Sequence, residues 1–318
     1  MSFSSQTKGE LARVVPTKKC CMLAEITGFL RVAGSLRLVG GGKFTIVAST
    51  ENPAIARHYK TLIREYFGSN AGIEVGNSQV PGKARGSYRY SLVIRPDEKS
   101  LQILRETGMI LIKEGNDFLS DGIYQPIIRN KCCKKAYLRG LFLGVGTMSD
   151  PRKSYHLEFV LNSSQVAQDL KRLIGSFVDL SAGLLERGEE HVVYMKRAEY
   201  ISDMLGIMGA NEAMLEFENI RIGRGLRREV NRISNCDNAN VDRTLSAAEQ
   251  QIKYIELIDA KLGLDNLDPV LRETAQLRLE LPGASLTDIG EALRPPIKKP
   301  GVSKRFAKLK EIAESLDK

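Results

Sequence analysis

A lysine-cysteine-cysteine run that occurs twice constrains the fold of this chain more than any other feature. The first copy is KCCMLAEITGFLRVAG, residues 19–34, and the second is KCCKKAYLRGLFLGVG, residues 131–146. The two copies are separated by about the length of a small domain. The repetition therefore predicts two half-domains of one design in a single chain.

The repetition extends beyond this run, because Ile55-Ala56 recurs as Val166-Ala167 and Arg85-Gly86 recurs as Arg187-Gly188. Periodicity and turn residues predict the same order of elements in both copies, about 18–110 and 130–210. After the motif helix, the first copy has expected strands at 43–48, 73–80 and 88–94 and helices at 53–67 and 99–108; the second has strands at 155–161, 181–186 and 191–196 and helices at 164–178 and 198–206. The predicted fold class is α+β, with an αββαββα pattern that occurs twice.

Small side chains recur at every fourth position within both copies of the run. They are Ala24, Gly28 and Val32 in the first copy and Ala136, Gly140 and Gly144 in the second. This spacing puts each set on one face of a helix. Glycine costs about 1 kcal/mol against alanine inside a helix. We therefore expect the two helices to pack closely on each other across a pseudo-twofold axis. The alternative is two independent helices in separate cores.

The charge is concentrated in two short segments. The chain has 318 residues, which predicts two or three domains, and a net charge of +9. Residues 294–310 hold seven Lys and Arg without an acid, and residues 221–232 hold five Arg against Glu229. Concentrated basic charge is typical of a surface that binds a polyanion. Neither a membrane-spanning run nor the apolar core of a secretory signal is present, so we expect a cytoplasmic protein without membrane association.

The five cysteines predict neither disulfides nor a metal centre. They are Cys20, Cys21, Cys132, Cys133 and Cys236, an odd number in a reducing compartment. Adjacent cysteines lack the two-residue gap that lets two thiolates face one zinc ion, and the three histidines lie far from them in sequence. We expect no cofactor.

The last hundred residues have a helical pattern. Residues 221–240 are rich in Arg and Asn, and we expect them to form a connector. Arg227 and Arg228 in this connector either contact phosphates or are only solvated. Within 241–318 we expect a first helix capped by Asn240 and stopped by Gly263, a second from Asp268-Pro269 to about residue 281, a third opened by a capping box at 285–288 and a fourth after Pro300-Gly301. A short helix before a basic one predicts a helix-turn-helix domain.

In that domain the fourth helix would enter the major groove of DNA. Its first turns nominate Ser303, Lys304, Arg305 and Lys308 for base contacts, and Lys298, Lys299 and Lys310 complete the expected DNA-binding set. The turn RPPIKKPG is about twice the common length. The alternative is a small helical bundle whose basic face is only solvated.

The segments ITGFLRVAG, residues 26–34, and LRGLFLGVG, residues 138–146, resemble the two motifs of LAGLIDADG homing endonucleases. The resemblance implies a duplicated αββαββα saddle. It also places Ala33 and Val145 where that family has the acids that hold divalent ions. Neither side chain can ligate a hard cation, so no catalytic residue is expected. A nuclease using displaced acids, Glu25 or Asp150, remains a less favoured alternative.

Both halves together resemble the WhiA family, through MSFSSQTKGEL, SYHLEF, NRISNCDNAN, LRETAQLRLELP and GVSKRFAKLKEIAESL. Membership implies a non-enzymatic regulator that binds double-stranded DNA on the nucleoid and acts in sporulation, or in cell division and chromosome segregation. The alternative is a protein-interaction scaffold that binds transcription or division proteins and uses DNA only for localisation. Cations on the saddle strands would serve DNA binding or only solubility: Lys83, Arg85, Arg89, Arg187 and Lys196.

Overall fold

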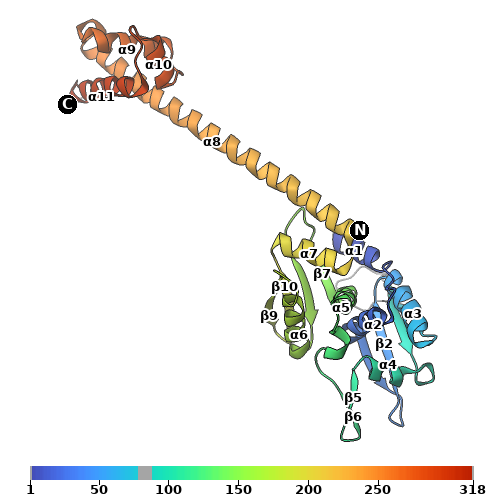
Figure 1. The fold of residues 1–318 in the computed structure, drawn as a ribbon. Helices are drawn as coiled ribbons and strands as arrows, with labels where there is room; N and C mark the ends of the chain where they lie inside the picture. The colour runs from blue at the N-terminus through green and yellow to red at the C-terminus, as the bar shows by residue number, and fades with distance from the viewer. Residues whose placement is uncertain (1, 78–87, 317–318) are drawn as a thin grey trace. The chain divides into compact units, whose positions relative to one another are not determined.

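The structure is a computed structural model that describes residues 2–77 and 88–316 (Figure 1). The chain divides into two compact units, Met1–Arg224 and Gly225–Lys318. Within the described ranges, no helix is both long and apolar enough to cross a membrane.

The first unit contains two copies of one α+β arrangement. The first copy comprises α2 (Lys19–Ala33), β1 (Gly34–Leu38), β2 (Phe44–Thr50), α3 (Pro53–Phe67), β3 (Gly72–Asn77), β4 (Tyr88–Ile94) and α4 (Ser100–Glu106). The second comprises α5 (Lys131–Val145), β7 (Gly146–Met148), β8 (Leu157–Leu161), α6 (Ser164–Gly175), β9 (Gly183–Arg187), β10 (Glu190–Met195) and α7 (Ala198–Met208). The predicted αββαββα order is confirmed twice.

Each copy forms a four-stranded antiparallel sheet with the same connectivity. The strand orders are β1-β2-β4-β3 and β7-β8-β10-β9. In each sheet the first strand directly continues a motif helix, since Gly34 and Gly146 follow Ala33 and Val145 in extended conformation. Helices cover one face of each sheet, and side chains from both copies share one hydrophobic core (Figure 1).

Three features of this unit were not predicted. Helix α1 (Phe3–Leu11) packs against α5 and β7 of the second copy and α3 of the first, and Glu10 accepts hydrogen bonds from the backbone N–H groups of Glu212 and Ala213. A hairpin of β5 (Ile110–Lys113) and β6 (Asn116–Leu119) separates the copies, and the short helix η2 (Gln125–Ile128) follows it. Several predicted features lie outside the described residues, namely Lys83, Arg85-Gly86 and the end of the strand predicted at 73–80.

The second unit consists of helices. Helix α8 (Asn211–Lys261) runs into it from the first unit and is followed by η3 (Leu264–Asn266), α9 (Pro269–Glu280), α10 (Leu286–Ala292) and α11 (Lys299–Leu316). Asp268 caps α9, and Ser285 and Asp288 form the predicted capping box of α10. The core of this unit is formed by Ile255, Ile258, Leu267, Leu271, Ala275, Ile289, Leu293, Val302, Phe306, Leu309 and Ala313.

Two predictions about helix ends are wrong. Asn240 caps no helix, because α8 is continuous through the whole predicted connector and Asn240 lies in its interior. Helix α11 begins at Lys299 rather than after Gly301. Proline at the second helical position needs no N–H donor there, so Pro300 extends the helix start instead of preceding it. The turn between α10 and α11 is shorter than predicted for the same reason.

Candidate nucleic-acid interface

Helices α10 and α11 are fixed to each other by close backbone packing at Gly290. The N–H of Ile297 donates to the carbonyl of Gly290 over 2.9 Å. A Cβ atom at Gly290 would lie 2.3 Å from the carbonyl oxygen of Ile297 and 3.0 Å from a methyl group of Val302. The turn before α11 therefore lies directly on α10, as a helix-turn-helix pair requires.

Arg278 holds α9, α8 and the start of α10 together from inside the unit. Its side chain is buried, and its guanidinium donates to Gln251 Oε1 over 3.0 Å and to the carbonyls of Leu281 and Ala284 over 3.2 and 2.6 Å. It also lies 5.3 Å from the ring centroid of Phe306 on α11. Burial lowers the pKa of Arg278. A fixed cation with several partners therefore sets the positions of the helices.

Arg305, which was nominated for base contact, donates to two acceptors on α9 in this structure. Its Nη1 donates to Thr274 Oγ1 over 3.1 Å and to the carbonyl of Val270 over 3.5 Å, both on α9. The Arg305 residue is half-buried. This guanidinium finds acceptors within its own domain and braces α11 against α9, and its contact with a base stays a prediction.

The remaining nominated residues form an exposed basic strip at the start of α11. Ser303, Lys304 and Lys308 are exposed, while Val302 and Phe306 of the same helix are buried in the core. Lys298 and Lys299 are exposed at the turn. Lys310 lies further along and pairs with Glu314, with Nζ and Oε1 3.6 Å apart. We call Lys298, Lys299, Ser303, Lys304 and Lys308 the α11 basic strip.

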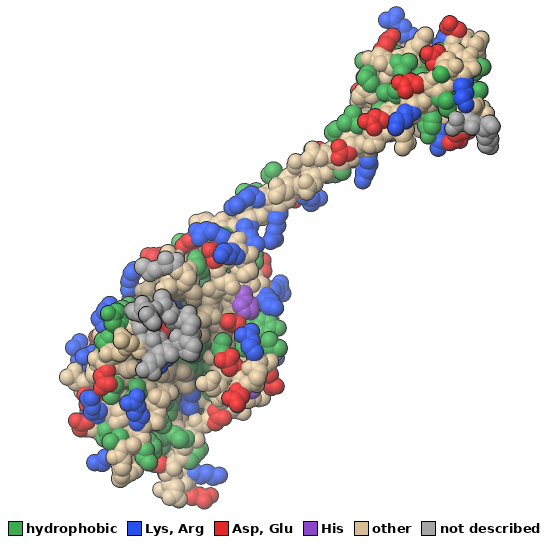
Figure 2. Space-filling view, turned by 180° about the vertical axis from the view of Figure 1, so that it is seen from behind, with side chains coloured by type: hydrophobic (Ala, Val, Ile, Leu, Met, Phe, Trp, Pro, Cys, Tyr) green, Lys and Arg blue, Asp and Glu red, His purple; other side chains and the backbone are tan. Residues whose placement is uncertain are grey.

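The arginines of residues 221–232 do not form one free cationic surface. Arg221 pairs with Glu199 and Glu218, and Arg232 pairs with Glu229. Arg224 donates to the carbonyl of Pro151 over 2.6 Å and lies against the ring of Tyr155. Figure 2 shows basic side chains along α8, and Arg227 and Arg228 are the exposed ones that the sequence nominated.

The motif helices α2 and α5 cross with backbone in contact with backbone. A Cβ atom at Gly28 would lie 2.4 Å from the carbonyl oxygen of Tyr137, and one at Gly140 would lie 2.3 Å from that of Glu25. At Gly144 it would meet a methyl group of Val32 at 2.5 Å. Ala24 and Ala136, the other members of the predicted stripe, are fully buried.

The displaced-acid alternative is weakened by the position of Glu25. This carboxylate is fully buried, receives 2.9 and 2.5 Å hydrogen bonds from Arg139, and lies 2.8 Å from His58 Nε2. Arg139 also donates to the carbonyl of Met208. Glu25 therefore links both copies of the repeat and has no access to a substrate. Asp150 accepts from the backbone N–H of Arg152 in a surface turn.

The positions at which homing endonucleases have their acids carry no ligating atoms in this chain. Ala33 and Val145 are the last residues of α2 and α5, and both are half-buried hydrocarbon side chains. Arg31, two residues before Ala33, donates to the carbonyls of Ser120 and Gly108 and so fixes the hairpin region.

The strand faces turned away from the helices carry acids as well as cations. Glu74 pairs with Arg95 over 3.2 Å, and Glu158 lies 3.0 Å from His156. Arg89 and Arg187 are exposed on strands of the two sheets. Lys196 lies 5.1 Å from the ring centroid of Tyr194. These cations are scattered, in contrast to the α11 basic strip.

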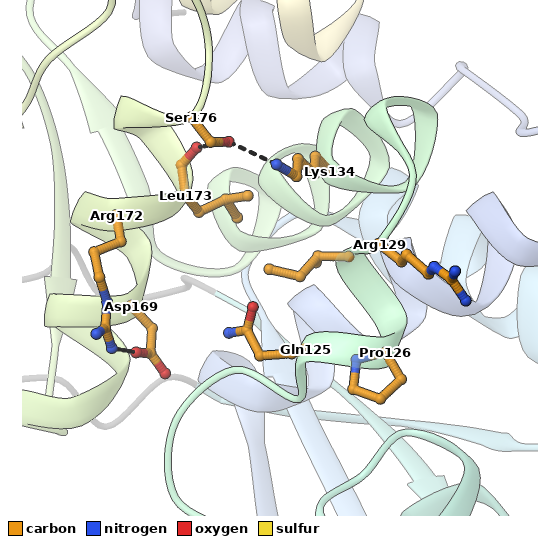
Figure 3. Close-up of a pocket in the computed structure, with 9 residues that line it drawn as sticks. Gln125, Pro126, Arg129, Lys134, Asp169, Arg172, Leu173 and Ser176 are labelled. Carbon is orange, nitrogen blue, oxygen red and sulfur yellow. Dashed lines mark hydrogen bonds and ion pairs between the residues drawn. The ribbon is translucent and has the colours of Figure 1, made fainter.

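A hollow of about 740 Å³ lies between η2, α5 and α6 (Figure 3). Its polar side chains bond to one another, since Arg172 pairs with Asp169 and Lys134 donates to Ser176 Oγ over 3.0 Å. Asp169 also accepts from the backbone N–H of Ile123. These contacts position η2 against α6, which is a structural role.

The fold brings the two cysteine pairs together, which the spacing within each pair did not indicate. The two pairs meet where α2 and α5 begin, and the four sulfur atoms lie within 4.8 Å of one another; they belong to Cys20, Cys21, Cys132 and Cys133. The spacing rule applies within one Cys-Cys pair, whereas here one pair lies against the other, so the absence of a metal stays a prediction. The duplication of the pair was the sequence signal that pointed to this meeting.

The fold and these contacts define a duplicated LAGLIDADG-like unit joined to a helix-turn-helix unit. Residues 19–110 match the WhiA N-terminal LAGLIDADG-like domain, 134–227 the WhiA LAGLIDADG-like domain, and 230–313 the WhiA C-terminal HTH domain. The chain belongs to the WhiA family.

Similar proteins cover almost the whole chain. A probable cell division protein WhiA of Alkaliphilus oremlandii is 46% identical over 318 residues, which is 99% of this chain and 98% of that protein. One of Alkaliphilus metalliredigens is 41% identical over 314 residues, with the same shares covered. The crystal structure of full-length WhiA from Thermotoga maritima matches with a TM-score of 0.59 at 24% identity and covers 99% of both chains, which supports the fold.

Proposed function

We propose that this protein is a non-enzymatic, sequence-specific regulator of transcription that binds double-stranded DNA through α11. The observation that carries the proposal is the α11 basic strip, because it is exposed, free of acids and held in place by a packed helix-turn-helix core. The start of a recognition helix is the part that meets base edges in the major groove.

The side chains of this strip have two different tasks. Ser303, Lys304 and Lys308 on the outer face of α11 would contact base edges. Lys298 and Lys299 at the turn would neutralise phosphates, and Arg227 and Arg228 on α8 would add contacts to the DNA backbone. Arg305 contributes indirectly, by orienting α11.

The biological role that we propose is control of genes for cell division and chromosome segregation, or for sporulation, by a cytoplasmic protein on the nucleoid. The similar proteins from Alkaliphilus are named probable cell division proteins. A helix-turn-helix domain supplies a way for such a protein to act on genes.

The test is DNA binding by the full chain after removal of charges from the strip. A preferred duplex is first selected from a randomised pool, and binding is then followed by fluorescence anisotropy across a salt series. Lys298→Ala with Lys299→Ala should weaken binding on every duplex and reduce the salt slope by about two, because each phosphate contact contributes about 0.9 to that slope. Lys304→Ala with Lys308→Ala should reduce discrimination between preferred and random duplexes by tenfold or more.

Lys253→Ala is the matched control, since this exposed lysine lies on α8 in the same unit. It should leave both affinity and discrimination unchanged. Equal affinity of the wild type and of the Lys304→Ala, Lys308→Ala variant for the selected duplex would refute the assignment of α11 as the reading helix.

A second function is favoured by the strand faces of the first unit. The acids Glu74 and Glu158 lie on these faces, so they suit a protein partner better than a DNA backbone. In this version the saddle binds a transcription or division protein and DNA binding only localises it. This second hypothesis predicts that a full-length variant that no longer binds DNA still restores normal cell division in cells that lack the native protein.

Nuclease activity is the least supported alternative, because Ala33 and Val145 end the motif helices. We expect supercoiled DNA to stay intact when it is incubated with the protein and magnesium. Nicking that disappears when a chelator is added would contradict a non-enzymatic role.

A further inference from the structure

Four cysteine thiols meet at the crossing of the motif helices. Cys20 and Cys21 lie in the first turn of α2, and Cys132 and Cys133 lie in the first turn of α5. All four sulfur atoms lie within 4.8 Å of one another, and those of Cys132 and Cys133 are 4.0 Å apart. Within the described residues this is the group of His, Cys, Asp and Glu side chains close enough to hold a metal ion.

We propose that these four cysteines bind one zinc ion as a structural tetrathiolate site that joins the two halves of the duplicated unit. Zinc prefers four ligands in a tetrahedron, with Zn–S bonds of about 2.3 Å, so its ligand sulfurs lie about 3.8 Å apart. The observed separations require each sulfur to move by less than about 1 Å, which rotation about the Cα–Cβ bonds supplies.

The surroundings suit a site that carries net negative charge. Four thiolates and one Zn²⁺ carry two negative charges, and the thiol protons are released to solvent when the metal binds. Lys18, Lys19 and Lys131 precede the cysteines in both copies. Both helix starts face the site, and neither Lys18 nor Asn130 caps its helix with a side chain. The N–H groups of both first turns can therefore donate to sulfur, which orients ligands.

The graded exposure of the ligands matches a structural site at the edge of a core. Cys21 and Cys133 are buried, Cys132 is half-buried and Cys20 is exposed. An iron–sulfur cluster would hold the thiolates around several metal atoms and therefore further apart than around a single ion. A tetrathiolate with no open position favours a structural over a catalytic role.

The main rival is a pair of disulfides across the helices. Disulfide bonding would join sulfurs two by two, leaving the pairs independent of each other, whereas the structure brings all four to one centre. The rival predicts the loss of two hydrogen atoms per bridge and no bound metal.

The test measures metal in the full-length protein, expressed in zinc-supplemented medium and purified with reductant and without chelator. Plasma mass spectrometry should find about one zinc per chain, and native mass spectrometry should show the same single adduct. Cys21→Ser with Cys133→Ser should lower the zinc content at least tenfold. Cys236→Ser is the matched control, because this exposed cysteine on α8 is remote in sequence from the four ligands, and it should leave the content unchanged.

A second measurement covers the case in which the double variant does not fold. Wild-type protein stripped of metal under anaerobic conditions is titrated with Co²⁺, which should give the visible absorption of tetrahedral cobalt and the charge-transfer bands of thiolate ligation at one equivalent. Zinc should then displace the cobalt and remove both signals. Four reactive thiols without metal uptake, or two disulfides in protein isolated with thiols trapped at lysis, would overturn the proposal.

Discussion

Replacing Gly28 by alanine tests whether the motif helices depend on direct backbone contact. The added Cβ atom would lie 2.4 Å from the carbonyl oxygen of Tyr137 and 3.2 Å from the backbone nitrogen of Leu141. Ordinary van der Waals contact begins near 3.4 Å. The facing atoms belong to the backbone of α5 and cannot rotate away, so the two helices must separate locally by about 1 Å.

Two opposing effects determine the magnitude. Overpacking of a close-packed core costs about 1–3 kcal/mol, and the rigid neighbours here favour the upper end. Alanine returns about 1 kcal/mol because it favours the helical backbone more than glycine does. We therefore expect Gly28→Ala to lower the free energy of unfolding by about 2 kcal/mol. Gly140→Ala should cost a similar amount, and the double variant less than the sum, because one separation of the helices accommodates both methyl groups.

Tyrosine provides a signal for the first unit. The chain has ten tyrosines and no tryptophan, and Tyr254 is the one tyrosine after residue 224. Urea unfolding of the full chain followed by near-ultraviolet circular dichroism therefore reports mainly on that unit. Gly9→Ala in α1 is the matched control, because a Cβ atom there meets nothing within 4 Å, and it should be neutral or slightly stabilising. If Gly28→Ala is as stable as Gly9→Ala, the helices do not require this contact and the reasoning fails.

Three further perturbations test other contacts. Glu25→Gln leaves the buried Arg139 cation without its counter-charge and should lower the free energy of unfolding in urea by about 3 kcal/mol. If the loss in the double variant Glu25→Gln, Arg139→Gln equals the sum of the two single losses, the two side chains are not coupled. Burial lowers the pKa of Lys8 to about 8, and the negative charge of Glu51 only partly offsets this by raising the pKa. The unfolded state therefore binds more protons between pH 8 and 10.5, and the free energy of unfolding should rise by roughly 2 kcal/mol over that range, a rise that Lys8→Met removes. Arg278→Met removes two partly buried hydrogen bonds, to the carbonyls of Leu281 and Ala284, and should destabilise the second unit by about 2 kcal/mol, seen as faster hydrogen exchange in α11; unchanged exchange would contradict the bracing role.

The elements that the sequence predicted well have local signals. The helix predicted at 53–67 is α3, and in the structure the side chain of Asn52 caps its start and the left-handed Gly68 ends it. The capping box at Ser285 and Asp288 defines α10 in the same way, and its hydrogen bonds lower the pKa of Asp288. These signals act within a few residues, so a reader of the sequence can recognise them without tertiary information.

The features that were missed depend on contacts between distant segments. Helix α8 continues through an Asn- and Arg-rich stretch because no proline interrupts it, although that composition is typical of a connector. Arg305 carries the charge expected of a DNA contact, but Thr274, distant in sequence, determines where its guanidinium points. The meeting of the cysteine pairs likewise follows from the crossing of α2 and α5 and from nothing within either pair.

The motif helices contain the contacts that hold the two halves together, and these contacts are physically separable from the helix ends, where Ala33 and Val145 stand at the positions of the acids of homing endonucleases. Close packing depends on Gly28 and Gly140 in the middle of the helices, and the buried pair of Glu25 and Arg139 depends on the same crossing. The acids of the endonuclease family would stand at the helix ends, where Ala33 and Val145 are half-buried at the margin of the core. Replacing an end residue therefore leaves the crossing intact, whereas replacing a central glycine does not. A chain can lose the acids and still keep the saddle as a platform for another function.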